Sequence, residues 1–320
     1  MPWRETKVPY KIWLSEIILQ QTRVEQGLPY YLSFIESYPE VADLAKALED
    51  QVLRSWQGLG YYNRARNLHK TAKLVSDQMH GVFPDSYEKL LSLPGVGPYT
   101  AAAIASICYE EEVPVVDGNV IRLVSRHFLM EESVDSSSGA KAITALAKEW
   151  IQGRLPSRFN QAMMEMGATV CLPANPKCDM CPVADSCMAL RNGAVEGLPL
   201  KKAKKSPLDR YLIYHVHLDK GATWIQKRGV QGIWASLYEW PNQEVALGQL
   251  TKALNKFKTH EQFEFLHVLS HQRIHGHFIV HHGPAKNAND LIQVQWIELD
   301  AFPLPRLMTR FLEQFKAKER

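Results

Sequence analysis

LPGVGPYTA, residues 93–101, predicts a helix, a turn with two glycines and a second helix. Gly95 and Gly97 can adopt backbone angles that are closed to other residues, so the amides at the start of the second helix can face outward. Such amides can bind a phosphate, and carbonyls of the same turn can bind a cation. An ordinary helix-helix turn gives the same pattern, so the motif alone leaves both interpretations open.

The sequence on both sides of this motif predicts helices. Apolar residues recur every three or four positions from Val8 to about Leu190, as in KIWLSEIILQQ (11–21) and YTAAAIASICY (99–109). Proline, glycine and acidic residues separate the periodic segments, as start and stop signals do. We therefore predict a helical domain over residues 1–192.

The rest of the chain has a different pattern. GAVEGLPLKKAKKSPLDR (193–210) has no apolar period and is rich in lysine, so we predict a basic linker that can lie along phosphates. Residues 211–320 predict a smaller α+β domain, because apolar, β-branched and aromatic residues partly alternate there. The predicted strands are YLIYHVHL (211–218), TWIQKR (223–228), IWASLYEW (233–240), FLHVLSH (265–271) and HGHFIVHH (275–282), followed by a helix around residues 305–316.

Composition limits the possible classes of protein. The chain has 320 residues, 46% of them hydrophobic, and a net charge of +3, which permits an anionic partner without requiring one. No apolar run approaches the roughly 18 residues of a membrane helix, and MPWRETK at the start lacks a signal-peptide core. We expect a monomer with no membrane association that is cytoplasmic, if the source is bacterial.

Four of the five cysteines lie close together: Cys171, Cys178, Cys181 and Cys187 form a C-x6-C-x2-C-x5-C array. Their thiolates can close on one metal centre, because the intervening loops contain the prolines and polar residues that turns need. Zinc ribbons usually have two C-x2-C knuckles, so one knuckle with longer, unequal loops favours an iron-sulfur cluster over zinc. Cys108 stands alone in an apolar run and is predicted to be a buried small hydrophobe.

Three elements in this order, the hairpin at 93–101, VVDGNV at 115–120 and the cysteine array, resemble the helix-hairpin-helix DNA glycosylases of the endonuclease III superfamily. Further stretches resemble the MutY family of adenine DNA glycosylases, which act on adenine opposite 8-oxoguanine. These are PWRETKVPYKIWLSEIILQQTRV (2–24), GLGYYNRARNLHK (58–70) and FNQAMMEMGATVC (159–171).

The resemblance implies a mainly α protein. It would consist of a two-lobed helical helix-hairpin-helix glycosylase domain with a four-cysteine [4Fe-4S] cluster and a C-terminal α+β Nudix-like domain. That second domain lacks the glutamate-rich helix of Nudix hydrolases, so we expect it to recognise the lesion without hydrolase activity.

Glu16 is the first candidate catalytic residue. Its predicted helix places it among apolar residues, where burial would raise its pKa and let it act as a general acid. A surface glutamate in an ion pair is the simpler interpretation of such a residue. The resemblance implies that Glu16 protonates the imidazole-ring nitrogen of adenine and positions the attacking water.

Asp117 is the second candidate. Cleavage of the sugar-adenine bond builds positive charge on the sugar, which a carboxylate can stabilise. The sequence DGN also predicts a helix N-cap at this position, and both interpretations can hold. Tyr99 and Asn119 are expected beside the sugar and its water. The resemblance also implies that Tyr99 stands where bifunctional relatives have a lysine, so no Schiff base is expected.

The resemblance further implies residues that would contact DNA. Tyr61 corresponds to an intercalating tyrosine, Gln21 to a wedge, and Ser270 and His271 to a loop that reads 8-oxoguanine, although Leu269 replaces its usual phenylalanine. Tyr62 is expected to be the core residue of the tyrosine pair. The full set is Trp3, Arg4, Gln20, Gln21, Thr22, Leu59, Tyr61, Gly95, Gly97, Gln161, Ser270 and His271.

The sequence thus predicts a monofunctional adenine DNA glycosylase of base excision repair. Its substrate would be double-stranded DNA with adenine opposite 8-oxoguanine or guanine, and its product an abasic site. The alternatives are a thymine-mismatch or oxidised-pyrimidine DNA glycosylase on the same scaffold, and a lesion-binding protein without catalysis.

Overall fold

The structure is a computed structural model that describes residues 1–202, 206–285 and 288–318. The chain divides into two compact units that do not follow the order of the sequence. The first unit contains Met1–Lys46 and Lys70–Ala203, and the second contains Ala47–His69 and Lys204–Arg320. The predicted boundaries at residues 192 and 210 stay predictions.

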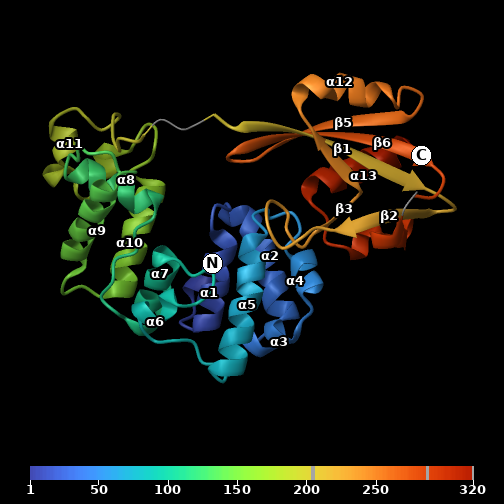
Figure 1. Cartoon of the computed structure of the whole chain (residues 1–320). Coiled ribbons are helices and arrows are strands. Elements are labelled where there is room, and N and C mark those ends of the chain that lie inside the picture. The colour runs from blue at the N-terminus through green and yellow to red at the C-terminus, as the bar shows by residue number, and fades with distance from the viewer. Residues whose placement is uncertain (203–205, 286–287, 319–320) are drawn as a thin grey trace. The chain divides into compact units, whose positions relative to one another are not determined.

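The first unit is helical (Figure 1). Its helices are α1 (Pro9–Leu19), α2 (Val24–Ser37), α3 (Val41–Lys46), the second part of α5 (Asn63–Gln78), α6 (Tyr87–Leu91), α7 (Pro98–Tyr109), α8 (Gly118–His127), α9 (Ser137–Ile151), α10 (Pro156–Thr169) and α11 (Met188–Arg191). Short 3-10 helices are η1 (Pro2–Arg4), η2 (Cys178–Met180) and η3 (Ala184–Ser186). Proline occupies the first turn of α1, α7 and α10, where its missing amide costs no hydrogen bond.

Helix α7 lies at the centre of this unit. The run from Thr100 to Ser106 is buried on every side, and the helix packs against α1, α6 and α10. This explains why its sequence is apolar almost throughout and not amphipathic. Residues on the facing turns of α1 and α10 are thereby brought next to the start of α7.

The predicted helix-turn-helix at residues 93–101 is confirmed, since it joins α6 to α7. Gly95 has a φ of +75°, a left-handed conformation that favours glycine. Gly97 differs from the expectation. It is the N-cap of α7 with a φ of −88°, and a Cβ there would meet nothing within 4 Å. Only the first glycine is therefore required by its backbone angle.

The second unit contains α4 (Glu49–Ser55), the start of α5 and the C-terminal sheets. Strands β4 (Asn242–Val245), β1 (Leu208–Leu218), β6 (Gln272–His282) and β5 (Glu261–Val268) form one mixed sheet in that order, with β1 and β6 parallel. Strands β3 (Tyr238–Glu239), β2 (Ala222–Lys227) and β7 (Ile292–Gln295) form an antiparallel sheet. Helix α12 (Leu247–Asn255) and helix α13 (Arg306–Lys318) lie on opposite sides of the mixed sheet (Figure 1).

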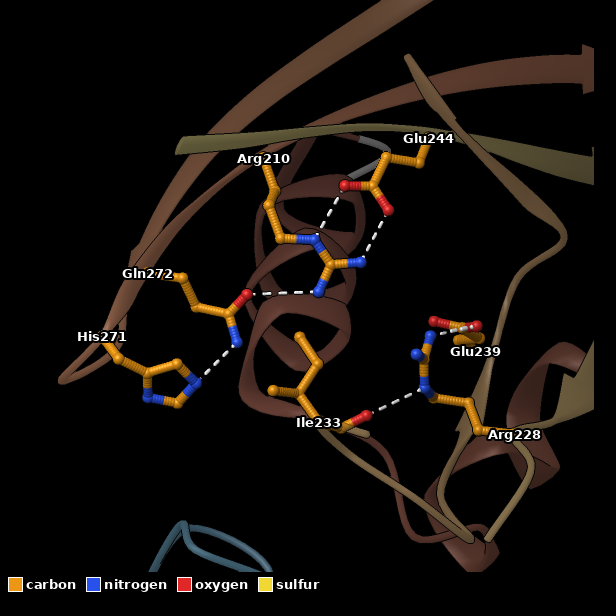
Figure 2. Close-up of polar contacts among 7 residues, drawn as sticks. All are labelled: Arg210, Arg228, Ile233, Glu239, Glu244, His271 and Gln272. Carbon is orange, nitrogen blue, oxygen red and sulfur yellow. Dashed lines mark hydrogen bonds and ion pairs between the residues drawn. The ribbon is translucent and has the colours of Figure 1, made fainter. Parts of the chain in front are cut away.

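Most predicted strands are confirmed, but IWASLYEW (233–240) is mainly a turn and only its residues 238–239 form a strand. Trp234 and Ser236 have positive φ values, which a strand does not allow. Arg228 holds this turn, since it donates to the carbonyl of Ile233 at 3.1 Å and to Glu239 at 2.5 Å (Figure 2). The apolar residues of the segment are buried although they lie in a turn. A buried turn and a buried strand give similar apolar runs in the sequence.

The prediction missed β4, β7 and α12. The first two are four-residue strands at sheet edges, too short to show a clear alternation of apolar residues. Helix α12 does repeat Leu247, Leu250 and Leu254 at helical spacing, although none of its residues is buried.

The segment predicted as a linker is partly folded. The carbonyl of Leu200 accepts a hydrogen bond from the amide of Val134 at 3.0 Å, and β1 already begins at Leu208. Lys201 and Lys202 are exposed, whereas Lys204 and Lys205 lie outside the described residues. In the described part of the chain, no helix is long and apolar enough to cross a membrane.

Candidate active site and DNA interface

Glu16 lies on α1, between the buried residues Ser15 and Ile17. Burial, which is the largest cause, and the charge of Asp117 raise its pKa, whereas a hydrogen bond with Tyr99 lowers it; the resulting pKa is about 7. Burial also raises the pKa of Tyr99, so the phenol stays protonated, and its hydroxyl lies 3.8 Å from Sδ of Met164. Glu16, Tyr99 and Asp117 therefore share one site, and Glu16 can hold a proton near neutral pH.

Asp117 caps the start of α8, as the simpler interpretation of its sequence predicted. Its Oδ1 accepts hydrogen bonds from the amides of Asn119 at 2.9 Å and Val120 at 2.7 Å, and its Oδ2 accepts one from Nδ2 of Asn119 at 2.8 Å. The positive end of the α8 dipole lies at the same carboxylate. These donors fix the orientation of the carboxylate in the site.

Arg122, one turn along α8, supports Asn119 from behind. It is buried and donates from Nη2 to Oδ1 of Asn119 at 3.0 Å and to the carbonyl of Gly167 at 2.6 Å. Its Nε donates to the carbonyl of Cys171 at 2.6 Å. A continuous set of hydrogen bonds thus joins Asp117 to the first cysteine of the array.

The end of α1 is tied to the start of α7. Nε2 of Gln20 donates to the hydroxyl of Thr100 at 3.2 Å, and Thr100 is buried. Glu16 lies on α1 and Tyr99 on α7. The hydrogen bond between Gln20 and Thr100 therefore helps to keep Glu16 and Tyr99 close to each other.

The four predicted cysteine ligands line one pocket. Cys171, Cys178, Cys181 and Cys187 face it together with apolar residues such as Leu123 and Val183. Burial and the other three cysteines raise the pKa of Cys178, as expected where four thiols are close. Among the described residues, no group of three or more His, Cys, Asp or Glu side chains is placed to hold a metal ion. The four thiols that line this one pocket are the donor set that a [4Fe-4S] cluster needs.

Arg126 of α8 closes the inner side of this pocket. It is 2% exposed, and its Nη1 donates to Sγ of Cys171 at 3.4 Å and to the carbonyl of Leu172 at 2.7 Å. A buried guanidinium beside the sulfurs favours a negatively charged group there. The remaining cysteine, Cys108, lies on α7 outside the pocket, and burial raises the pKa of its thiol to about 12.

The residues of the first unit that were predicted to contact DNA differ in how far they are exposed to solvent. Trp3 is buried with its ring 5.0 Å from that of Tyr31, and Arg4 pairs with Glu165 of α10 at 3.1 Å. Gln161 is half-buried on α10, and Thr22 is half-buried beside the exposed Gln21. Gln21 has a φ of +53°, a left-handed conformation that costs energy for a residue with a side chain.

Tyr61 of the second unit shows the same two features, with a φ of +47° and a side chain that is 51% exposed. Tyr62 is buried and donates to the carbonyl of Leu304 at 3.4 Å, so the prediction that it is the core residue of the pair is confirmed. Leu59 is also buried, and its side chain is not available to DNA. Ser270 and His271 are exposed at the turn between β5 and β6.

Comparison with known proteins shows the family. Residues 14–153 match the HhH-GPD superfamily of base excision DNA repair proteins, and residues 213–314 match the NUDIX domain. An adenine DNA glycosylase of Buchnera aphidicola subsp. Baizongia pistaciae is 37% identical over 280 residues, which cover 85% of this chain and 78% of that protein. That of Buchnera aphidicola subsp. Acyrthosiphon pisum is 33% identical over 99% of this chain and 93% of the relative. The chain belongs to the adenine DNA glycosylase family.

The resemblance to the MutY family is thus confirmed, and the chain is a DNA glycosylase that excises adenine in base excision repair. Solved structures agree on the fold. A thermostable thymine-DNA glycosylase is 30% identical with a TM-score of 0.56, over 60% of this chain and 88% of that one. Endonuclease III in a non-covalent complex with DNA has a TM-score of 0.51 at 22% identity, over 58% of this chain and 85% of that one. DNA is the substrate of this chain because it is a DNA glycosylase, as its relatives and its family show.

Four residues of the site were not singled out from sequence: Thr100, Arg122, Arg126 and Gly167. The two arginines are spaced one helical turn apart in GNVIRLVSRH, a spacing that puts both on one face of α8. This spacing, next to an aspartate N-cap, was the available signal.

Proposed function

We propose that this enzyme removes adenine paired with 8-oxoguanine or guanine and leaves an abasic site without cutting the strand. The observation that carries the proposal is the half-buried Glu16, which shares one site with Tyr99 and Asp117 and has a pKa raised to about 7 by desolvation. We also expect it to act as a monomer in the cytoplasm.

Glu16 would serve as the general acid. Loss of adenine as an anion is slow, and protonation of its imidazole ring makes it a better leaving group. A carboxylic acid with a pKa near 7 holds this proton under neutral conditions and can release it in the transition state. The resulting carboxylate can then orient the attacking water.

Asp117 would stabilise the positive charge that develops on the sugar. The Asn119 side chain and two backbone amides hold the carboxylate in one orientation before the reaction begins, so little reorganisation is needed. Tyr99 supplies a hydrogen bond to Glu16 and offers no amine. Without an amine at that position, water and not a lysine completes the hydrolysis.

The four-cysteine pocket would hold a [4Fe-4S] cluster. When bound, the cluster would crosslink the loop from Cys171 to Cys187 and add negative charge beside Arg126. The hydrogen bonds of Arg122 connect the first cysteine of this pocket to Asn119 beside Asp117, which supports a structural role for the cluster. The chemistry of base removal needs only the two carboxyl groups.

Several residues would recognise the bases. Tyr61, which is exposed and has a left-handed backbone, is suited to intercalate where a base is extruded. Gln21 is also exposed with a left-handed backbone and would act as a wedge. Ser270 and His271 would contact the oxidised base. Trp3, Arg4 and Gln161 would surround the adenine, and the turn at Gly95 and Gly97 would bind phosphate.

A thymine-mismatch glycosylase is the second candidate, because a solved thymine-DNA glycosylase is 30% identical to this chain. Single-turnover assays would compare duplexes with adenine opposite 8-oxoguanine, adenine opposite guanine, and thymine opposite guanine. We expect adenine release only, with most rapid release opposite 8-oxoguanine. Thymine release would contradict the proposal.

Substitution of Glu16 tests the catalytic assignment. Glu16→Gln should slow adenine release at least about a hundredfold while duplex binding persists, because the amide cannot donate an acidic proton. Glu25→Gln, an exposed glutamate at the start of α2, is the matched control and should react like the wild type. A Glu16→Gln enzyme that still turns over rapidly would remove Glu16 from the mechanism.

A further inference from the structure

The loop that carries Ser270 and His271 has a fixed backbone. The amide of Leu269 donates to the carbonyl of Gln272 at 2.8 Å, and the amide of Leu208 donates to the carbonyl of His271 at 3.1 Å. Both exposed side chains therefore start from positions set by β1 and β6. The direction in which each hydroxyl or imidazole hydrogen points is set by the groups behind them.

Those groups form a row of hydrogen bonds (Figure 2). Glu244 on β4 accepts from Nε of Arg210 at 2.8 Å and from Nη2 at 2.6 Å. Nη1 of Arg210 donates to Oε1 of Gln272 at 3.1 Å. Nε2 of Gln272 lies 2.9 Å from Nε2 of His271, and Nδ1 of His271 lies 3.2 Å from Oγ of Ser270. Gln272 is 6% exposed, so water cannot replace these partners freely.

The chemistry of each group decides the direction of every bond in this row. A guanidinium can only donate, so the Gln272 oxygen must face Arg210 and its amide hydrogens must face His271. Nε2 of His271 then has to accept, which leaves the imidazole hydrogen on Nδ1. That hydrogen points to Oγ of Ser270, so the serine accepts from His271 and its own hydrogen is left to donate elsewhere.

We propose that Gln272, held by Arg210 and Glu244, is a positioning residue that fixes His271 as the Nδ1-H tautomer and thereby sets the hydrogen-bond polarity of Ser270. This inference rests on the proposed function, in which Ser270 faces the oxidised base. It adds a specificity determinant in the buried layer beneath the exposed loop.

The polarity matters because the two purines differ on the edge that such a loop reads. Guanine presents N7 as an acceptor beside C8-H, whereas 8-oxoguanine presents N7-H as a donor beside the acceptor O8. A serine that accepts from His271 still has one lone pair and one hydrogen free, so it can accept from N7-H and donate to O8. A serine that donated to His271 could not reach O8 with a hydrogen, and 8-oxoguanine would lose one of its two bonds.

Gln272→Glu exchanges the donor and acceptor roles in the hydrogen bonds beyond Gln272, while the side chain keeps nearly the same shape. A carboxylate accepts from Arg210 and also from His271, so the imidazole hydrogen should move to Nε2 and Nδ1 should then accept from Ser270. The readout is the nitrogen NMR spectrum of the full-length protein with labelled histidine at pH 8.5. His271→Asn identifies the signal by its disappearance.

We expect Nδ1-H in the wild type and Nε2-H in Gln272→Glu. The ratio of adenine release opposite 8-oxoguanine to that opposite guanine should fall about tenfold, as for the loss of one hydrogen bond. Gln262→Glu adds the same charge on β5 at an exposed glutamine and should change neither readout. If Gln272→Glu fails to fold, Gln272→Met, which removes the amide without adding charge, should give a mixture of tautomers.

Wild-type His271 with its hydrogen on Nε2 would overturn the inference, as would a switched tautomer with an unchanged ratio. A retained single Nδ1-H tautomer in Gln272→Met would overturn it as well. A wild-type enzyme without preference for 8-oxoguanine would instead contradict the proposed function. The spectra of the free protein would then still decide whether Gln272 sets the tautomer.

Discussion

A Cβ atom at Gly167 would lie 2.6 Å from Cβ of Asn119, so α10 crosses α8 at a point where only glycine fits. The backbone of Asn119 is as near as its side chain, with the carbonyl oxygen at 2.8 Å. Gly167→Ala must therefore displace the start of α8, including the cap at Asp117. We predict that it destabilises the protein by about 1–3 kcal/mol and slows adenine release at saturating enzyme, measured by chemical denaturation and single-turnover kinetics.

Ala168→Ser is the control for this change, because it alters the neighbouring residue of α10 at an exposed position. It should preserve both stability and rate. A Gly167→Ala enzyme with wild-type rate would show that the position of Asn119 does not matter for Asp117.

Tyr99 should control the pH dependence of the reaction. As a general acid with a pKa of about 7, Glu16 is protonated below that pH, so the rate should fall as the pH rises through it. The Tyr99 phenol lowers the pKa of Glu16, so Tyr99→Phe should raise it and extend activity to higher pH. The measurement is the single-turnover rate from pH 6 to 9.

Tyr109→Phe removes a phenol from the same helix that bonds instead to the carbonyl of Phe83 at 3.2 Å. Its pH profile should coincide with that of the wild type. An alkaline limb that moves to lower pH in Tyr99→Phe would mean that the phenol does not stabilise the Glu16 carboxylate.

Local sequence was enough to predict the elements whose interactions are local. Proline at the start of α7, the Asp-Gly-Asn cap of α8 and the cysteine spacing each depend on neighbours a few residues away. The membership of α4 in the second unit could not be predicted in this way. It depends on Asp50, which accepts from Lys227 at 2.7 Å and from Tyr238 at 2.8 Å, partners separated by 177 and 188 positions.

The candidate site shows the same limit. Glu16 could be found because its predicted helix places it among apolar residues and because the resemblance to the MutY family gives this position the role of the acid; the helical pattern alone favoured a surface glutamate. Arg122 and Gln272 are ordinary polar residues in sequence, and their roles come from partners on other elements. A glycine inside a helix, such as Gly167, indicates from sequence that another part of the chain packs closely against it. The sequence does not show that this neighbour is Asn119.

The cysteine pocket predicts a selective effect on bound iron. Cys178→Ala should lower the iron content below four per chain and weaken absorbance near about 400 nm, because a [4Fe-4S] cluster needs four thiolates. Cys108→Ala should keep the full iron content, since burial raises the pKa of Cys108 to about 12 and it lies outside the pocket. Metal analysis of both proteins is the measurement, and stoichiometric zinc in place of iron would contradict the cluster.

The stacked histidines of the mixed sheet predict a stability that falls in mild acid. His281 of β6 stacks on His217 at 4.6 Å and lies 3.0 Å from Nδ1 of His215, and burial with the neighbouring histidines lowers its pKa to about 4. Between about pH 4 and the ordinary value near 6.5, the unfolded chain binds more protons than the folded one, so acid favours unfolding. We expect His281→Gln to remove about 1 kcal/mol of the stability difference between pH 7.5 and 5, discounted for its partial exposure.

His282→Gln changes the exposed neighbour and should leave that difference as in the wild type, because its side chain lies outside the stack. Urea denaturation measures the stability at both pH values. If His281→Gln and the wild type lost the same stability between pH 7.5 and 5, the protonation of other histidines, and not of His281, would cause the loss.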